Sequence, residues 1–299
     1  MKIVANGINV EVEDSGPGLN AQGIERPVVM LIMGLGMQLI AWPATFVQAL
    51  VDAGYRVVRF DNRDIGLSQH FDHLGMPNIL WAGVKARLGA NVSFDYSLAD
   101  MAQDALGVLD ALQVQRAHIV GVSMGGMIAQ RVALAAPARS LSLTSIMSTS
   151  GARGLPQAKT PVLRAMLSRP ANMTPQAIGD FYVQLLKVIG SPGFPVPEAD
   201  VRERANAAFK RNYHPQGVAR QMMAIMADSK RARELEKIKV PTLVLHGTDD
   251  VLVPFACGQD TARRIPNAAF VPVKGMGHDL PPGVQKHLLS SMLPHFQGA

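Results

Sequence analysis

The sequence predicts an α/β fold in which a mostly parallel sheet carries helices on both faces and a helical insertion interrupts the pattern. Three observations lead to this prediction. Apolar runs alternate with helical segments over the first half of the chain, the alternation stops between Thr149 and Lys239, and it resumes at Val240. Prolines punctuate the interrupted stretch, which has helical segments and no strand candidate.

The strand predictions depend on short apolar runs that turn signals bound on both sides. Residues 3–13 alternate well enough for a strand or hairpin around Gly7, before residues 15–18 break the chain. The later runs are continuous, as expected of strands that are covered on both faces. They are residues 28–33, 55–60, 117–122, 141–147, 240–246 and 269–273.

Helices are expected where apolar residues share one face between recognisable ends. Pro43 suits the first turn of a helix that Gly54 ends. Ser97 and Asp100 form a capping box at the start of another helix, whereas residues 69–96 lack a clear period and predict an irregular segment with a short helix. One more helix is expected between residue 123 and Pro137, and others at 161–169, 176–189, 198–212, 216–228, 255–264 and 283–293.

Composition indicates a globular chain with a substantial core. Hydrophobic residues make up 48% and charged residues 17% of the 299 positions, and no apolar run reaches the length of a membrane span. The N-terminus lacks the apolar core of a signal peptide, and Cys257 is the single cysteine. A disulfide framework is therefore excluded, and a cytoplasmic location is expected. The sequence leaves open whether the protein forms a homo-oligomer.

The net charge of +6 raises the question of nucleic-acid binding. Basic residues form two modest clusters, at 202–211 and 230–239, and glutamates at 203, 234 and 236 interrupt both. We interpret these clusters as solvated helix faces and expect no nucleic-acid partner. The histidines and the cysteine show no metal-ligand spacing, so neither a metal nor a cofactor is expected.

The most informative segment is Gly121-x-Ser123-x-Gly125, between a predicted strand and a predicted helix. A serine in so tight a turn has a strained backbone that lifts its Oγ clear of the sheet. The flanking glycines leave room where strand and helix nearly touch, and the helix N-terminus offers free N–H groups to a developing negative charge. An ordinary Gly/Ser turn has the same spacing, so the serine needs partners elsewhere in the chain.

A serine hydroxyl is a good nucleophile only beside a general base, and an acid must fix the tautomer of that base. We assign the base to His278, in a Gly-rich loop after the last predicted strand. His246 ends a strand nearby and is the alternative, which we interpret as a structural polar residue. Of the adjacent Asp249 and Asp250 only one can reach the histidine; we assign Asp250 and expect Asp249 to be a cap or turn residue.

Two backbone N–H groups are needed to stabilise a tetrahedral oxyanion. We assign them to Met124, directly after the serine, and to Leu35, in the loop after the strand at 28–33. The Gly-x-Gly around Leu35 has two other interpretations, an ordinary tight turn and a dinucleotide-binding loop. The dinucleotide-binding pattern requires a further glycine where this chain has Leu39, which disfavours it.

In combination these motifs resemble the α/β-hydrolase superfamily over nearly the whole chain. The matching segments are 33–36, Asp61-x-Arg63-x-x-Gly66-x-Ser68, 121–126, Gly247-Thr248-Asp249-Asp250-x-x-Val253-Pro254 and 277–278. The stretches 31–34, 41–43 and 61–64 look like a bacterial subgroup of serine carboxylesterases. One departure is Met33, where many members of the superfamily have a histidine that supports the oxyanion loop.

The resemblance implies a core domain of residues 1–148 and 234–299 and a helical cap of residues 149–233 over the active site. The cap then carries candidate acyl-pocket residues, for which packing of the cap onto the core is an equally good role. These candidates are Phe181, Leu185, Met222, Met223 and Met226. A pocket rich in flexible methionines would suit varied apolar groups.

The activity that the resemblance implies is that of a serine carboxylesterase. It would hydrolyse small to medium carboxylic esters, its small-molecule partners, through an acyl-enzyme intermediate. The same triad would also serve a lactone, an enol-lactone or a carbon–carbon bond beside a ketone. A binding protein without catalysis is expected to have lost a triad member, and dehalogenases and epoxide hydrolases use an aspartate where this chain has Ser123.

Overall fold

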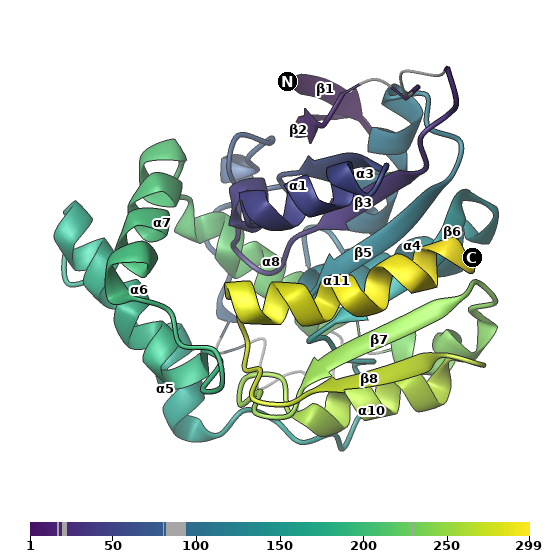
Figure 1. Ribbon diagram of the computed structural model, residues 1–299. Helices are drawn as coiled ribbons and strands as arrows, with labels where there is room; N and C mark the ends of the chain where they lie inside the picture. The colour runs from purple at the N-terminus through teal and green to yellow at the C-terminus, as the bar shows by residue number, and fades with distance from the viewer. Residues whose placement is uncertain (17, 20–22, 80, 82–93, 229) are drawn as a thin grey trace.

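The computed structural model describes residues 1–299 except 17, 20–22, 80, 82–93 and 229 (Figure 1). Of the segment predicted to be irregular, at 69–96, residues 80 and 82–93 therefore lie outside the described residues. Within the described part, eight strands form one sheet. The strands are β1 Lys2–Ala5, β2 Ile8–Asp14, β3 Val28–Ile32, β4 Arg56–Phe60, β5 Ala117–Val122, β6 Ser140–Ile146, β7 Thr242–Gly247 and β8 Ala269–Val273.

The sheet is mostly parallel, in the order β1-β2-β4-β3-β5-β6-β7-β8. β1 pairs antiparallel with β2 and β2 with β4, whereas the pairs from β4 to β8 are parallel. The β1–β2 hairpin turns at Asn6 and Gly7, whose φ values of 49° and 75° match the right-handed twist of the strands. The predicted fold class and the predicted N-terminal hairpin are confirmed.

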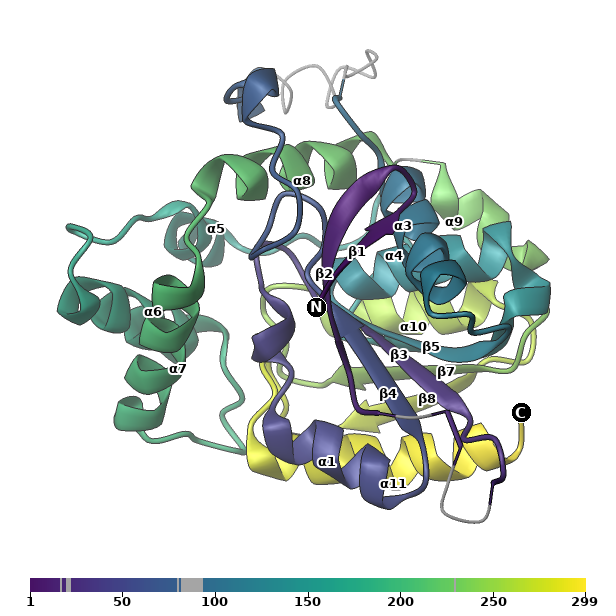
Figure 2. The same ribbon diagram turned by 90° about the horizontal axis from the view of Figure 1, so that it is seen from above.

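Helices cover both faces of this sheet. Their bounds are α1 Ala44–Asp52, α3 Leu98–Ala111, α4 Met124–Ala135, α5 Thr160–Leu167, α6 Pro175–Ile189, α7 Glu198–Arg211, α8 Pro215–Ala227, α9 Arg231–Glu234, α10 Phe255–Arg264 and α11 Pro282–Gln297. Short 3-10 turns are η1 Leu39–Ala41, η2 Asp72–Leu74, η3 Pro137–Arg139 and η4 Leu235–Lys237. Figure 2 shows α1 and α11 on one face and α3 and α4 on the other.

A hydrophobic core lies on each face of the sheet, and β3 contributes side chains to both. Val29 and Leu31 share a hydrophobic cluster with side chains of α1 and α11. Met30 and Ile32 share the opposite cluster with side chains of α3 and α4. All four side chains are fully buried, which explains why the strand appears in the sequence as a continuous apolar run.

The insertion lies between β6 and β7 and consists of helices, as predicted. α5, α6, α7 and α8 lie within two residues of the helices expected at 161–169, 176–189, 198–212 and 216–228. The described residues of 149–239 contain no strand. Figure 1 shows α5, α6 and α7 grouped beyond the end of the sheet toward which the arrow of β7 points.

Two sequence-based expectations are wrong. The last helix, expected at 283–293, continues through Pro294 to Gln297, because the buried Phe296 packs there against Tyr55 and His118. The basic cluster at 230–239 is not simply a solvated face. Arg231 begins the short helix α9 and is 1% exposed, because its guanidinium bonds to Gln130 and pairs with Asp228.

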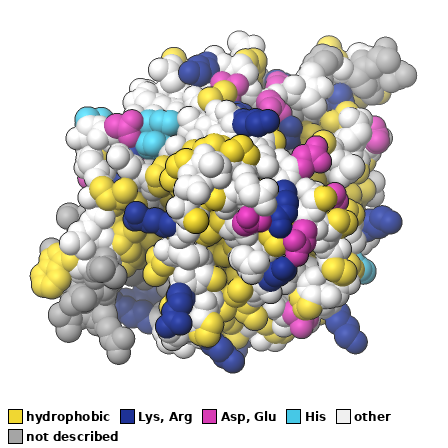
Figure 3. Space-filling view, turned by 90° about the vertical axis from the view of Figure 1, so that its left-hand side faces the viewer, with side chains coloured by type: hydrophobic (Ala, Val, Ile, Leu, Met, Phe, Trp, Pro, Cys, Tyr) yellow, Lys and Arg dark blue, Asp and Glu magenta, His cyan; other side chains and the backbone are white. Residues whose placement is uncertain are grey.

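The surface carries charges of both signs. Figure 3 shows basic and acidic side chains interspersed on the face that it presents. In the cluster at 202–211, Arg202 pairs with Asp180 and Glu198. None of the helices formed by the described residues combines the length and the apolar character needed to cross a membrane.

Candidate active site

Ser123 lies in a strained turn between β5 and α4. Its φ of 54° and ψ of −121° fall in a region that residues other than glycine rarely adopt. A Cβ on Gly121 would lie 2.0 Å from the carbonyl oxygen of Gly125, and a Cβ on Gly125 would lie 2.1 Å from that of Ile32. Both positions therefore require glycine. Gly121 lies at the close approach of strand and helix that the sequence predicted, whereas Gly125 lies against the end of β3.

A chain of hydrogen bonds joins Ser123 to the two residues that the sequence assigned as its partners. The Oγ of Ser123 lies 3.0 Å from Nε2 of His278, and Nδ1 of His278 lies 2.7 Å from Oδ2 of Asp250. These residues are 155 and 28 positions apart in the sequence. They follow β5, β8 and β7, whose parallel carboxyl ends meet at one edge of the sheet.

The carboxylate of Asp250 is held from two sides. Oδ1 accepts hydrogen bonds from the backbone N–H groups of Leu252 and Val253, at 2.9 and 2.8 Å, which leaves Oδ2 for His278. Burial opposes ionisation, but the attraction to the imidazolium form of His278, the hydrogen bond from that ring and the Val253 amide outweigh burial and lower the pKa of Asp250. An ionised carboxylate accepts from Nδ1–H of the imidazole and leaves Nε2 free to take a proton.

The neighbouring candidates have different contacts. Asp249 accepts hydrogen bonds from Thr248 and from the backbone N–H of Gly275, and so joins its turn to the loop that carries His278. His246 is fully buried, and its Nε2 lies 2.8 Å from the carbonyl oxygen of Val253 and 3.6 Å from Oδ2 of Asp250. Burial lowers the pKa of His246. Both residues thus support the turn around Asp250.

The turn after β3 lies directly against the serine. A Cβ on Gly34 would be 3.2 Å from the Cβ of Ser123, and the N–H of Met37 bonds back to the carbonyl of Gly34 over 3.2 Å. Leu35 occupies this turn, while Met124 opens α4 on the other side of the serine. The two amides assigned as oxyanion donors therefore belong to the two segments that flank Ser123.

The candidate pocket residues lie on two helices of the insertion. Phe181 and Leu185 are on α6 and are half-buried. On α8, Met223 is 7% exposed, and Met222 and Met226 are half-buried. The Phe181 ring stands edge-on to that of Tyr182, with centroids 5.3 Å apart.

Sequence reasoning missed two polar residues beside His278. Oδ1 of Asp279 accepts hydrogen bonds from the backbone N–H and the hydroxyl of Ser191. The backbone N–H of His278 donates to the carbonyl of Ile189 over 2.7 Å. Asp279 directly follows the assigned base, which is a usable signal, but nothing local marks Ser191, which is 88 positions away.

One group of side chains in the described part of the chain could approach a metal ion. His70, Asp72 and His214 have ligand-type atoms within 4.8 Å of one another. The two imidazole rings stack at 3.9 Å and are nearly parallel, so their in-plane lone pairs run side by side and do not converge on one ion. His214 instead bonds to the carbonyl of Asp64 and to Asp72, which fastens the start of α8 to the segment around η2.

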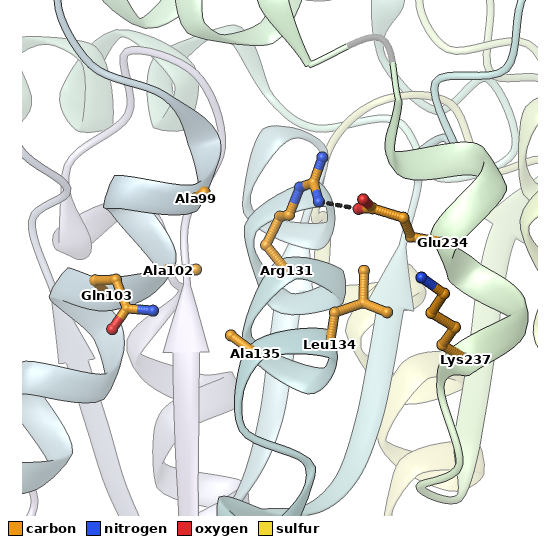
Figure 4. Close-up of a pocket in the computed structure, with 8 residues that line it drawn as sticks. All are labelled: Ala99, Ala102, Gln103, Arg131, Leu134, Ala135, Glu234 and Lys237. Carbon is orange, nitrogen blue, oxygen red and sulfur yellow. Dashed lines mark hydrogen bonds and ion pairs between the residues drawn. The ribbon is translucent and has the colours of Figure 1, made fainter.

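A separate groove of about 290 Å³ lies between α3, α4, α9 and η4. Figure 4 shows Arg131 and Glu234 paired across it. Its lining residues are Ala99, Ala102, Gln103, Arg131, Leu134, Ala135, Glu234 and Lys237. Arg131 stands about two turns along α4 from Ser123, and none of the predicted site residues lines this groove.

The parallel sheet, the strand-to-helix turn at Ser123 and the insertion after β6 define an α/β enzyme of the hydrolase type. The sequence matches the alpha/beta hydrolase fold family over residues 27–281, and the chain therefore belongs to this family. The resemblance inferred from the motifs is confirmed.

Individual relatives agree with this assignment. A rhodomycin D methylesterase from Streptomyces peucetius is 30% identical over 302 residues, which cover 93% of this chain and 95% of the relative. A solved enol-lactonase from Burkholderia xenovorans LB400 has a TM-score of 0.71 at 21% identity and covers 99% of this chain and 100% of its own. A solved meta-cleavage product hydrolase from Pseudomonas fluorescens IP01 has a TM-score of 0.73 at 19% identity, and the match covers 100% of this chain and 97% of that hydrolase. The two structural likenesses show the fold.

Proposed function

We propose that this protein is a serine carboxylesterase that hydrolyses small to medium carboxylic esters. The observation that carries the proposal is the chain of hydrogen bonds from Ser123 Oγ through His278 to the buried Asp250. The strained backbone of Ser123 and its place at the N-terminus of α4 support a nucleophile there. The similarity to a methylesterase over 93% of the chain favours an ester as the substrate.

In the first half of the proposed reaction, Ser123 Oγ bonds to the ester carbonyl carbon while its proton passes to Nε2 of His278. The carbonyl electron pair moves onto oxygen, and the N–H groups of Leu35 and Met124 stabilise that oxyanion. Asp250 stabilises the imidazolium. When the tetrahedral intermediate collapses, the ester C–O bond breaks, and His278 returns the proton to the departing alcohol.

Water completes the cycle by the same route. It gives a proton to His278 as its oxygen attacks the acyl carbon on Ser123. Collapse of the second tetrahedral intermediate breaks the acyl–Oγ bond, releases the carboxylic acid and returns the proton to the serine. Each step uses only the three side chains and the two amides, so no metal or cofactor takes part in the proposed mechanism.

We also propose that residues 149–233 act as a cap over this site. The contacts of Ile189 and Ser191 with the loop of His278 support that role. Phe181 and Leu185 of α6 and the methionines of α8 are then the proposed lining of the acyl pocket. Flexible thioether side chains adapt to apolar groups of different shape, which suits a range of acyl groups.

Hydrolysis of a short p-nitrophenyl ester by the wild type and by Ser123→Ala tests the proposal. We expect turnover by the wild type and a loss on the order of 10⁴ or more in kcat for the variant. Comparable turnover by the two proteins would reject the esterase. A panel with matched lactones and with a substrate cleaved at a carbon–carbon bond beside a ketone separates the ester from the other substrates that this triad would serve.

A further inference from the structure

The loop that carries Leu35 lies against α8 of the insertion. Gly36, the next residue, has a φ of +68°, and a Cβ there would lie 2.9 Å from Cγ2 of Val218. The backbone N–H of Gly36 donates to Oε1 of Gln221 over 3.0 Å. Both Val218 and Gln221 belong to α8, so this helix contacts the loop by shape and by a hydrogen bond.

Gln221 is fixed at both ends of its carboxamide. Its Nε2 donates to the carbonyl oxygen of Arg63 over 2.8 Å, and the residue is fully buried. Arg63 is itself held by a buried ion pair with Asp104, at 2.6 and 2.7 Å. Only one orientation of the amide offers a donor to the carbonyl and an acceptor to the N–H of Gly36, so the two contacts determine that orientation.

Leu35 is therefore held between two fixed neighbours. Gly34, on one side, touches Ser123, and Gly36, on the other side, is bound to Gln221. The side chain of Met33, which directly follows β3, offers only a weakly accepting thioether. Its backbone carbonyl accepts a hydrogen bond from Asn62 over 2.9 Å.

We propose that Gln221 is a positioning residue, which directs the backbone N–H of Leu35 at the oxyanion through its hydrogen bond to Gly36. This inference rests on the proposed function, in which Leu35 is an oxyanion donor. Such donors act at about 2.7–3.1 Å from the developing charge, and loss of one costs about 10²–10³ in kcat. A loosened loop would misplace this donor without removing it, so we expect a smaller decrease in kcat than the loss of the donor would cause.

Gln221→Met tests the proposal, because it removes both hydrogen bonds at nearly constant volume. We expect kcat to fall by about 10- to 100-fold and KM to change by less than about threefold, since only transition-state stabilisation is lost. Gln285→Met is the matched control. Gln285, on α11, is also buried and bonded at both ends, to Thr45 and to the carbonyl of Leu280, and its substitution is expected to leave the amide exchange of Gly36 unchanged.

Amide hydrogen exchange of residues 34–39 supplies a readout that needs no substrate. We expect the amide of Gly36 to exchange at least about tenfold faster in Gln221→Met than in the wild type and in Gln285→Met. If the amide of Gly36 exchanges at the same rate in Gln221→Met as in the wild type, the proposal is overturned. Faster exchange of this amide in an active Gln221→Met enzyme whose kcat is unchanged also overturns it. A loss confined to KM also overturns it.

The failure of the esterase proposal is distinguishable from the failure of this one. Comparable turnover by the wild type and Ser123→Ala rejects the esterase, whereas exchange at Gly36 still decides whether Gln221 holds the loop. If Gln221→Met does not fold, Gln221→Asn provides the same test. It keeps the amide but shortens the side chain by one methylene, which withdraws the oxygen from Gly36.

Discussion

The hydroxyl oxygen of Ser191 accepts a hydrogen bond from the backbone N–H of Gly277, 2.9 Å away and one residue before His278. The same hydroxyl donates to Asp279, one residue after His278. Burial raises the pKa of Asp279, and the two hydrogen bonds from Ser191 oppose that rise. A segment of the insertion thus holds the loop of the proposed base on both sides of its imidazole.

Ser191→Ala is expected to loosen this loop. The loss of one buried hydrogen-bonding group predicts a decrease of about 1–3 kcal/mol in the free energy of unfolding. We expect kcat to decrease by about tenfold, because the imidazole of His278 is aimed less accurately at Ser123. Ser140→Ala is the control, since Ser140 is also buried and its hydroxyl donates to the carbonyl of Ala136. Ser140 begins β6 and so lies at the end of that strand remote from Ser123. Equal kcat in the two variants would contradict the positioning role.

The two adjacent aspartates are expected to differ sharply under the same substitution. Asp250→Asn places an amide opposite Nδ1 of His278, which disfavours the tautomer that can accept the serine proton, and should lower kcat by about 10⁴. Asp249→Asn changes turn contacts with Thr248 and Gly275 and should lower kcat by less than about tenfold. Ester hydrolysis by both purified variants measures the difference. A larger loss for Asp249→Asn would reverse the assignment of the acid.

Arg231 is expected to be a major determinant of stability. Burial lowers the pKa of its guanidinium, and the charge of Asp228 and their hydrogen bond oppose that shift. Arg231→Met removes a cation that pairs with the carboxylate of Asp228 in a buried site. We therefore expect the free energy of unfolding, measured in urea, to decrease by about 3–5 kcal/mol. Arg263→Met is the control, because that arginine is 74% exposed and should change stability by less than about 0.5 kcal/mol. Similar losses for both would refute the structural role.

The buried imidazole of His118 is expected to make the stability of the protein depend on pH. It is buried between Tyr55 and Phe296, and burial lowers its pKa to about 4. The unfolded chain takes up this proton near pH 6.5, whereas the folded chain takes it up only near pH 4, so the residue destabilises the fold as the pH falls between these values. The shift corresponds to about 3 kcal/mol, at about 1.4 kcal/mol per pH unit.

His118→Gln isolates this contribution. Urea unfolding of the wild type and the variant from pH 7 to pH 4 should show a flatter decline for the variant, because it has no imidazole to protonate. Parallel declines would mean that His118 does not titrate as its burial implies. The comparison cancels the contributions of other acids and bases that both proteins share.

Much of the fold was accessible from the sequence because its signals are local. Gly121 expresses a local steric requirement, because a Cβ there would meet the carbonyl of Gly125, and the structure has the predicted strand, turn and helix at this position. The alternation of strands and helices similarly predicted which segments end at one edge of the sheet. The order of Ser123, Asp250 and His278 along the chain was therefore enough to expect that they meet.

The supporting contacts were not accessible, because each joins segments that are far apart in the sequence. Gln221 binds a backbone N–H 185 positions away, and Ser191 binds one 86 positions away, without any periodicity or motif at either residue. The exposure of Arg231 was predicted wrongly for the same reason. A run of basic residues predicts exposure unless Asp228 and Gln130 are known to surround one of its members.

The most direct test of the account is covalent labelling with a fluorophosphonate, followed by intact-mass measurement and mapping of the modified peptide. If Ser123 is the nucleophile, we expect one adduct per chain, located at Ser123 and absent from Ser123→Ala. A wild-type protein that stays unlabelled, or an adduct at another serine that persists in Ser123→Ala, would contradict it.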